Sequence, residues 1–196
     1  MSAIKIIKKP NDISWDEIHE VVYQAHASNR EQGVDIRNAH LSGEELKNSI
    51  GEDGVCFVAL DGDKVVATSS LAFHCLHTWY ANGKKVGYGT LSAVLPEYKG
   101  QHIFSRLERT RMAYAKDVGC YGFYGKTAEG NKKRRNIAKK DGYYEVSIGR
   151  TSFNPHNYVT IFKWFEKCPH STIYIKYKYL MTYLRLKINL FLGRIK

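Results

Sequence analysis

The sequence lacks any long uninterrupted apolar run. Its most apolar stretch, from Leu180 to Leu192, is broken by Arg185 and Lys187, which argues against a transmembrane helix. The opening residues, MSAIKIIKKP, contain no apolar core of signal-peptide length. We therefore expect the protein to be made and kept in the cytoplasm.

Closely spaced cysteines are also lacking. The chain has four, widely separated and without a Cys-x-x-Cys pair: Cys56, Cys75, Cys120 and Cys168. This spacing excludes a dense disulfide scaffold, and we expect reduced, mostly buried thiols. His74 and His77 flank Cys75, but side chains three positions apart on a strand point to opposite faces. No metal site is therefore expected.

Internal repeats and low-complexity linkers are absent as well. A chain of 196 residues with 43% hydrophobic residues suits one well-packed domain. The net charge of +11 implies an anionic partner, such as a coenzyme phosphate, a nucleic acid or an acidic membrane surface. Charge alone does not choose among these partners.

The periodicity of the sequence predicts alternating strands and helices. Strands are expected at residues 3–9, 55–73 (a hairpin turning at 61–63), 85–95, 120–127, 143–150 and 158–165. Helices are expected from residue 14, where Ser14 and Glu17 have capping-box spacing, at 42–50, where Ser42 and Glu45 repeat it, and at 104–117 and 131–140. The last strand could pair with 143–150 across a polar turn at 154–157. This order predicts an α/β fold, a mixed central sheet flanked by helices, over residues 1–168.

The stretch LPEYKGQHIFSRLER, residues 95–109, joins a strand to a helix through a turn that contains Pro and Gly. The first backbone N–H groups of a helix have no intrahelical partner, and the peptide dipoles make that end partly positive. Such a passage is a potential phosphate cradle.

The region from Val55 to Tyr143 resembles the GCN5-related N-acetyltransferase (GNAT) family. The family's pyrophosphate-binding loop reads Arg or Gln, two variable residues, Gly, one variable residue, then Gly or Ala. This pattern falls on residues 99–104, with Leu107 at the apolar helix position that follows. The resemblance implies that acetyl-CoA is bound by Val94 and Leu95 along its pantetheine arm and, at the loop, by Lys99, Gly100, Gln101, His102, Ile103 and Phe104.

Three residues of the loop depart from the family pattern. Lys99 replaces Arg or Gln and keeps both a donor and a charge, whereas His102 stands where Gly is expected and lacks its freedom at positive φ. Phe104 replaces Gly or Ala and adds bulk. Because backbone amides, and not side chains, would contact the phosphates, we still expect the loop to bind the coenzyme.

A second part of the resemblance lies at residues 131–143. Asn131 is followed eleven residues later by Gly142 and then Tyr143, which is the family's spacing, and the resemblance implies that Asn131 contacts the coenzyme. In many relatives a Tyr on this helix protonates the departing thiolate. That position is Ala138 here, so the role does not transfer.

The reaction that the resemblance implies is attack of an amine on the thioester, with a backbone amide near Ala93 or Val94 stabilising the oxyanion. The amine must lose a proton to a base or a water chain. Candidate bases are His74, His77 and Tyr88. Tyr124, Tyr143 or Tyr144 could supply the missing acid, although core packing is the alternative use of each.

Two segments concentrate positive charge. The run NKKRRNIAKK, residues 131–140, fits a coenzyme phosphate, a nucleic acid or simply a solvated face.

The tail, residues 169–196, carries six cations and no acid: Lys176, Lys178, Arg185, Lys187, Arg194 and Lys196. Its apolar residues recur at helical steps at 173, 177, 180, 184, 188, 191 and 195, and this stripe could dock on the domain or a second subunit, or lie on an anionic membrane at the inner face. Strict alternation at 173–179 leaves a strand open there.

The prediction is a cytoplasmic acetyltransferase that uses acetyl-CoA to acetylate a small amine such as an amino sugar. Two alternatives remain open. One is a coenzyme A-binding module without turnover, and the other is a basic protein that binds a membrane surface or, less in keeping with the sequence, nucleic acid. A homodimer is a further expectation.

Overall fold

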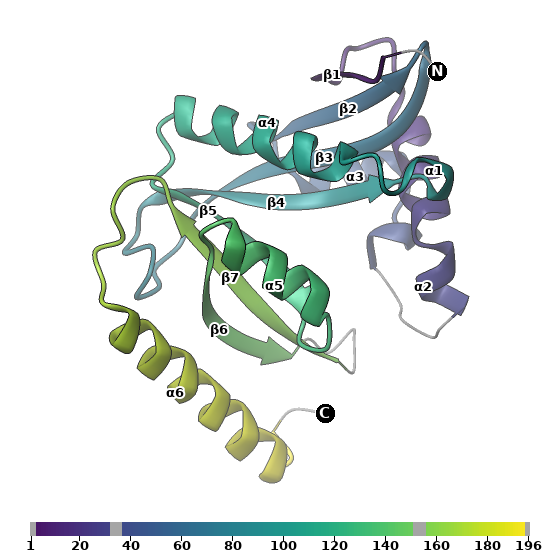
Figure 1. Ribbon diagram of the computed structural model, residues 1–196. Helices are drawn as coiled ribbons and strands as arrows, with labels where there is room; N and C mark the ends of the chain where they lie inside the picture. The colour runs from purple at the N-terminus through teal and green to yellow at the C-terminus, as the bar shows by residue number, and fades with distance from the viewer. Residues whose placement is uncertain (1–2, 32–36, 151–155, 195–196) are drawn as a thin grey trace. The chain divides into compact units, whose positions relative to one another are not determined.

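The computed structural model describes residues 3–31, 37–150 and 156–194 (Figure 1). The chain divides into two compact units. The first comprises residues 1–74 and 87–119, and the second comprises residues 75–86 and 120–196.

The strands and helices follow the predicted order. The strands are β1 (Lys5–Lys8), β2 (Val55–Asp61), β3 (Lys64–Cys75), β4 (Lys85–Val94), β5 (Gly122–Ala128), β6 (Tyr144–Arg150) and β7 (Asn157–Trp164). The α-helices are α1 (Trp15–Ala25), α2 (Ala27–Glu31), α3 (Gly43–Ser49), α4 (Ile103–Asp117), α5 (Lys132–Lys140) and α6 (Thr172–Phe191), with short 3₁₀ turns at η1 (Arg37–His40) and η2 (Pro96–Tyr98). The sequence did not predict α2 or η1.

The first unit is built on strands β1 to β4, which are neighbours in that order. β2 and β3 form the predicted hairpin, with Asp61 paired to Lys64, and β1 adds to β2 in antiparallel register. Both predicted capping boxes are present, at Ser14 and at Ser42. Figure 1 shows α4 on one side of these strands and α3 on the other. The core therefore lies between the strands and their helices, where Ile18, Val58 and Leu107 are fully buried.

The second unit contains β5, β6 and β7. β7 lies between the other two strands and pairs antiparallel with both, which confirms the expected pairing of residues 158–165 with 143–150. Residues 154 and 155 of the turn expected at 154–157 lie outside the described residues. Of the cysteines expected to be buried, Cys75 is exposed and Cys168 half-buried.

The tail forms helix α6, capped by Ser171, so the alternative strand at 173–179 is wrong. One face of α6 packs on β6, where Ile175 and Leu186 are buried and the Ile148 N–H donates to Thr182 Oγ1 at 3.2 Å. The predicted apolar stripe does not form this contact, because its described members all face solvent. Within the described residues, α6 and the other helices are too short or too polar to cross a membrane.

Candidate coenzyme-binding site

The last residues of β4 are distorted at Leu91. Its φ is +47°, which is the left-handed region, and its side chain is buried beside Leu46 and Ile50. Tyr88 packs against the same cluster although it is three residues away, whereas alternation would place the two on opposite faces. The strand thus has a local break of the kind that a β-bulge produces. Strained backbone of this sort is concentrated at functional sites.

The turn that follows β4 is tied to the β2–β3 hairpin at two points. The Leu95 N–H donates to Val66 O at 3.0 Å, and the Tyr98 hydroxyl donates to Asp61 Oδ2 at 2.9 Å. Within the turn, the N–H groups of Tyr98 and Lys99 donate to Leu95 O and Pro96 O. The turn therefore holds the start of the loop in a fixed position on unit one.

The loop enters helix α4 through two left-handed residues, Gly100 with φ +87° and His102 with φ +58°. His102 is the N-cap of α4, and its side chain makes no capping hydrogen bond. The first backbone bond of the helix runs from the Arg106 N–H to His102 O at 3.1 Å. Because the first-turn amides of a helix have no intrahelical acceptor, this exposed, uncapped end suits a bound anion.

His102 therefore adopts the conformation for which the family uses Gly. The sequence led us to expect less freedom at positive φ for this residue, but His is among the residues enriched in the left-handed region. Its exposed imidazole leaves the first turn of α4 without a side-chain cap. The helix begins at Ile103, one residue earlier than predicted, and Phe104 is half-buried.

The charged groups next to the loop are mostly engaged with one another. Exposed Glu97 pairs with Lys64 at 3.3 Å. A hydrogen bond from its own backbone N–H, and then Lys64, hold the pKa of Glu97 below its ordinary value. The hydrogen bond to Asp61 raises the pKa of Tyr98. Lys99, in contrast, is exposed at the mouth of the loop, where it can meet a phosphate.

Arg111 is a structural residue of this site that sequence analysis missed. It is only 3% exposed, and its Nη1 donates to the hydroxyls of Ser69 at 2.6 Å and Ser92 at 2.7 Å. The guanidinium thus links α4 to β3 and β4 directly. A basic residue in a helix ordinarily indicates a solvated face, so no local signal identifies this buried link.

His74 and Tyr88, two of the predicted bases, lie together. Their rings stack at 5.5 Å between centroids, with 26° between their planes. Tyr88 precedes Ala93 by five residues, an interval that would span about 16 Å in a regular strand and that contains the break at Leu91. A proton could pass between this pair and a group at Ala93 only through the acceptor or through water.

The candidate residues of the second unit have local structural partners. Asn131 caps α5, with its Oδ1 accepting from the Arg134 N–H at 3.0 Å. Ala138 is fully buried, and Tyr143 is 3% exposed with its ring edge-on to Phe123. Tyr124 is 6% exposed and Tyr144 packs edge-on to Trp164. The ring contacts of Tyr143 and Tyr144 show that both side chains pack within the second unit.

The basic run at 131–140 is partly neutralised. Arg135 forms a two-pronged ion pair with Glu145, at 2.7 and 2.9 Å, and donates to Glu129 O at 2.8 Å. Burial opposes ionisation of Glu145, but Arg135 and Lys139 outweigh it and lower its pKa. Among the residues that the structure describes, no group of three His, Cys, Asp or Glu side chains is placed to hold a metal ion.

Solved structures share this fold at low sequence identity. The ribosomal-protein-S18-alanine N-acetyltransferase from Escherichia coli is 13% identical with a TM-score of 0.63, covering 86% of this chain and 98% of its own. A GNAT-family acetyltransferase from Staphylococcus aureus Mu50 is 17% identical with a TM-score of 0.62, over 84% and 100% of the two chains. The NatC complex bound to Gag peptide and CoA is 12% identical in sequence with a TM-score of 0.64, and the match covers 85% of this chain and 100% of the matched chain. The predicted fold class is therefore confirmed.

No curated protein matches the sequence. The family model for the acetyltransferase (GNAT) family matches residues 15–143, which is well over half of the chain and contains β4, the loop and α4. A match of this extent shows that the chain belongs to the GNAT family of acetyl-CoA-dependent N-acetyltransferases.

Proposed function

We propose that this enzyme acetylates a small amine, such as an amino sugar, in the cytoplasm. The observation that carries the proposal is the uncapped start of α4 behind the left-handed residues Gly100 and His102. It supports a site for the diphosphate of acetyl-CoA. The amino sugar is the more specific part of the proposal. The many aromatic residues and the basic tail support it, because they fit an acceptor that is made near a membrane, such as an amino sugar of a surface polysaccharide.

The residues of the first unit suggest a division of roles. The loop amides and Lys99 bind the diphosphate, while Val94 and Leu95 line the path of the pantetheine arm. An amide near Ala93 or Val94 stabilises the oxyanion as the amine nitrogen attacks the carbonyl carbon. The carbon–sulfur bond then breaks, and the amine proton passes to a base.

We assign the base role to the His74–Tyr88 pair, acting through water or the acceptor because of its distance from Ala93. The departing thiolate has a pKa near that of Cys, about 8.5, so it can leave without a dedicated acid. The burial of Ala138 and Tyr143 is consistent with such a mechanism. Asn131 keeps its predicted contact with the coenzyme as a proposal, since its amide nitrogen can donate while Oδ1 caps α5.

A coenzyme-binding module without turnover is the second candidate. The observation that favours it is Ala138, which is fully buried at the position where many relatives have the Tyr that protonates the departing thiolate. A catalyst and a module differ in one measurable property. Both bind coenzyme A, but only the catalyst releases free thiol when an amine is added.

The test combines calorimetry with acetyl-CoA and a thiol-release assay over a panel of amines that includes glucosamine. We expect binding with release on at least one amine, and His74→Ala should slow release without weakening binding. A matched control is His170→Ala, which removes a half-buried, ring-stacked His from the second unit. Binding without release on any amine would favour the module, and absence of binding would refute both.

A further inference from the structure

Helix α6 has two apolar faces, and within the part of the chain that the structure describes only one of them is packed against another element. At the centre of the docking face, Ile175 is 3% exposed and Leu186 is 5% exposed. At 3.6 residues per turn these two residues lie within about 20° of each other around the helix. The face packs on β6, as the Ile148 to Thr182 hydrogen bond shows.

The opposite face forms an exposed stripe. Its residues lie roughly half a turn from the docking face, and every one is at least 45% exposed: Ile173, Tyr177, Leu180, Leu184, Ile188 and Phe191. Phe191 is 90% exposed. The stripe runs along a helix of 20 residues, about 30 Å long. A continuous apolar surface of this size marks an interaction site on a folded domain.

The orientation of the stripe is fixed by contacts at the start of α6. Tyr174 stacks on His170 at 5.1 Å between centroids, and both rings meet Trp79 edge-on at 5.7 and 5.4 Å. Because this aromatic cluster and β6 hold the docking face, the helix cannot rotate to bury its stripe without losing both contacts.

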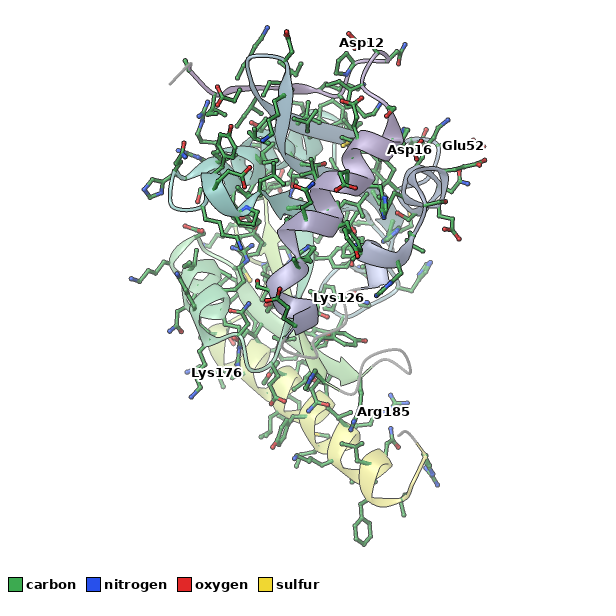
Figure 2. The ribbon with its side chains drawn as sticks, turned by 90° about the vertical axis from the view of Figure 1, so that its right-hand side faces the viewer. Asp12, Asp16, Glu52, Lys126, Lys176 and Arg185 are labelled. Atoms are coloured by element: carbon green, nitrogen blue, oxygen red, sulfur yellow. The ribbon has the colours of Figure 1, made fainter. Side chains whose placement is uncertain are left out.

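The charges around the stripe are all positive. Lys176 and Lys187 lie on one flank of α6, and Lys178 and Arg185 lie on the other, by the helical repeat. Figure 2 shows Lys176 and Arg185 on opposite sides of the helix. Residues 169–196 contain no Asp or Glu. A second copy of the helix would bring like charges together along both flanks, whereas an anionic bilayer offers the complementary charge.

We propose that α6 is a membrane-surface helix that places its exposed stripe into an anionic lipid bilayer. The six residues of the exposed stripe enter the boundary between headgroups and acyl chains. The flanking Lys and Arg side chains extend to lipid phosphates. The helix lies in the plane of the surface. The proposal is independent of the acetyl-transfer reaction, since it needs no part of β4 or the loop.

The test is sedimentation of the full chain with vesicles. The wild type should bind vesicles of phosphatidylcholine with about 30% phosphatidylglycerol much more tightly than pure phosphatidylcholine, and high salt should weaken the binding. Ile188→Glu should lower the partition coefficient by roughly tenfold or more, because it puts a carboxylate into the apolar boundary. Lys176→Gln with Lys187→Gln should lower it about tenfold through lost attraction.

The matched control is Ile137→Glu, the same substitution at an exposed Ile on α5, at 41% exposure against 56% for Ile188. It should leave binding close to that of the wild type, and circular dichroism should show both Glu variants folded. Equal loss in the two Glu variants would overturn the proposal, as would absence of wild-type binding to the anionic vesicles. So would a dimer, seen by light scattering, that Ile188→Glu converts to a monomer while vesicle binding is unchanged.

Discussion

At the scale of single residues, the loop depends on two left-handed backbone positions that differ in side chain. Gly100 has φ +87° and open space beside its Cα, so an added methyl group would meet no atom within 4 Å. The cost of substitution there is conformational alone. His102 has φ +58° and already bears that cost, which is about 1 kcal/mol for an L-residue.

The two positions give contrasting predictions for stability and for coenzyme A binding. Gly100→Ala should lower the free energy of unfolding by about 1 kcal/mol and weaken coenzyme A binding. His102→Gly should leave the free energy of unfolding within about 0.5 kcal/mol and retain or tighten binding, because it removes strain while adding freedom to the unfolded chain. Urea unfolding and calorimetry measure both quantities. Weaker binding by His102→Gly would show that the imidazole, rather than the backbone, contacts the coenzyme.

Arg111 supplies a second prediction at this scale. Arg111→Met removes a buried cation that donates to Ser69 and Ser92, and the free energy of unfolding should fall by about 2–4 kcal/mol. Arg109→Met, two residues away on the exposed face of α4, is the control and should change it by less than about 0.5 kcal/mol. Equal effects in a urea titration would contradict the role assigned to Arg111.

At the scale of elements, the ion pair between Arg135 of α5 and Glu145 of β6 should make stability depend on pH. The pKa of Glu145 is lower in the folded protein than its ordinary value, so the unfolded chain takes up a proton first as pH falls. The stabilisation is complete above the unfolded pKa, about 4.3, and is lost as pH falls through the folded pKa.

Glu145→Gln should therefore destabilise the protein at pH 7 by about 1–3 kcal/mol, since Arg135 loses its charged acceptor. Below the folded pKa of Glu145 the difference from the wild type should shrink. Glu166→Gln, which changes an exposed carboxylate, is the control and should follow the wild type at every pH. Thermal unfolding over a pH series measures this, and a constant difference across the series would argue against the ion pair.

The elements themselves were largely predictable, because capping boxes and periodicity are local. Ser14 and Ser42 start α1 and α3 as expected. The left-handed conformation of Leu91 and the burial of Arg111 were not predictable, since both depend on residues distant in sequence. Which face of α6 packs on the domain was not predictable for the same reason. Both faces are apolar, and only the contact with β6 decides that Ile175 and Leu186, rather than Ile173 and Leu184, are buried.

At the scale of the whole molecule, the net charge of +11 should attract a polyanionic cosubstrate. Acetyl-CoA carries its charge on phosphates, so its KM should rise with ionic strength as screening shortens the reach of the protein's field. This long-range attraction adds to the local contact proposed for Lys99. The two effects can be separated, because removing a charge far from the loop changes only the long-range attraction.

Lys99→Gln should raise the KM for acetyl-CoA about three- to tenfold at low salt, through loss of one charged contact with phosphate. Lys47→Gln removes the same unit of charge from α3, where the side chain is exposed, and should change KM by less than about twofold. Steady-state kinetics over a salt series compares the two. A shift of equal size in both variants would mean that net charge alone attracts the cosubstrate, and that the loop does not bind its phosphates through Lys99.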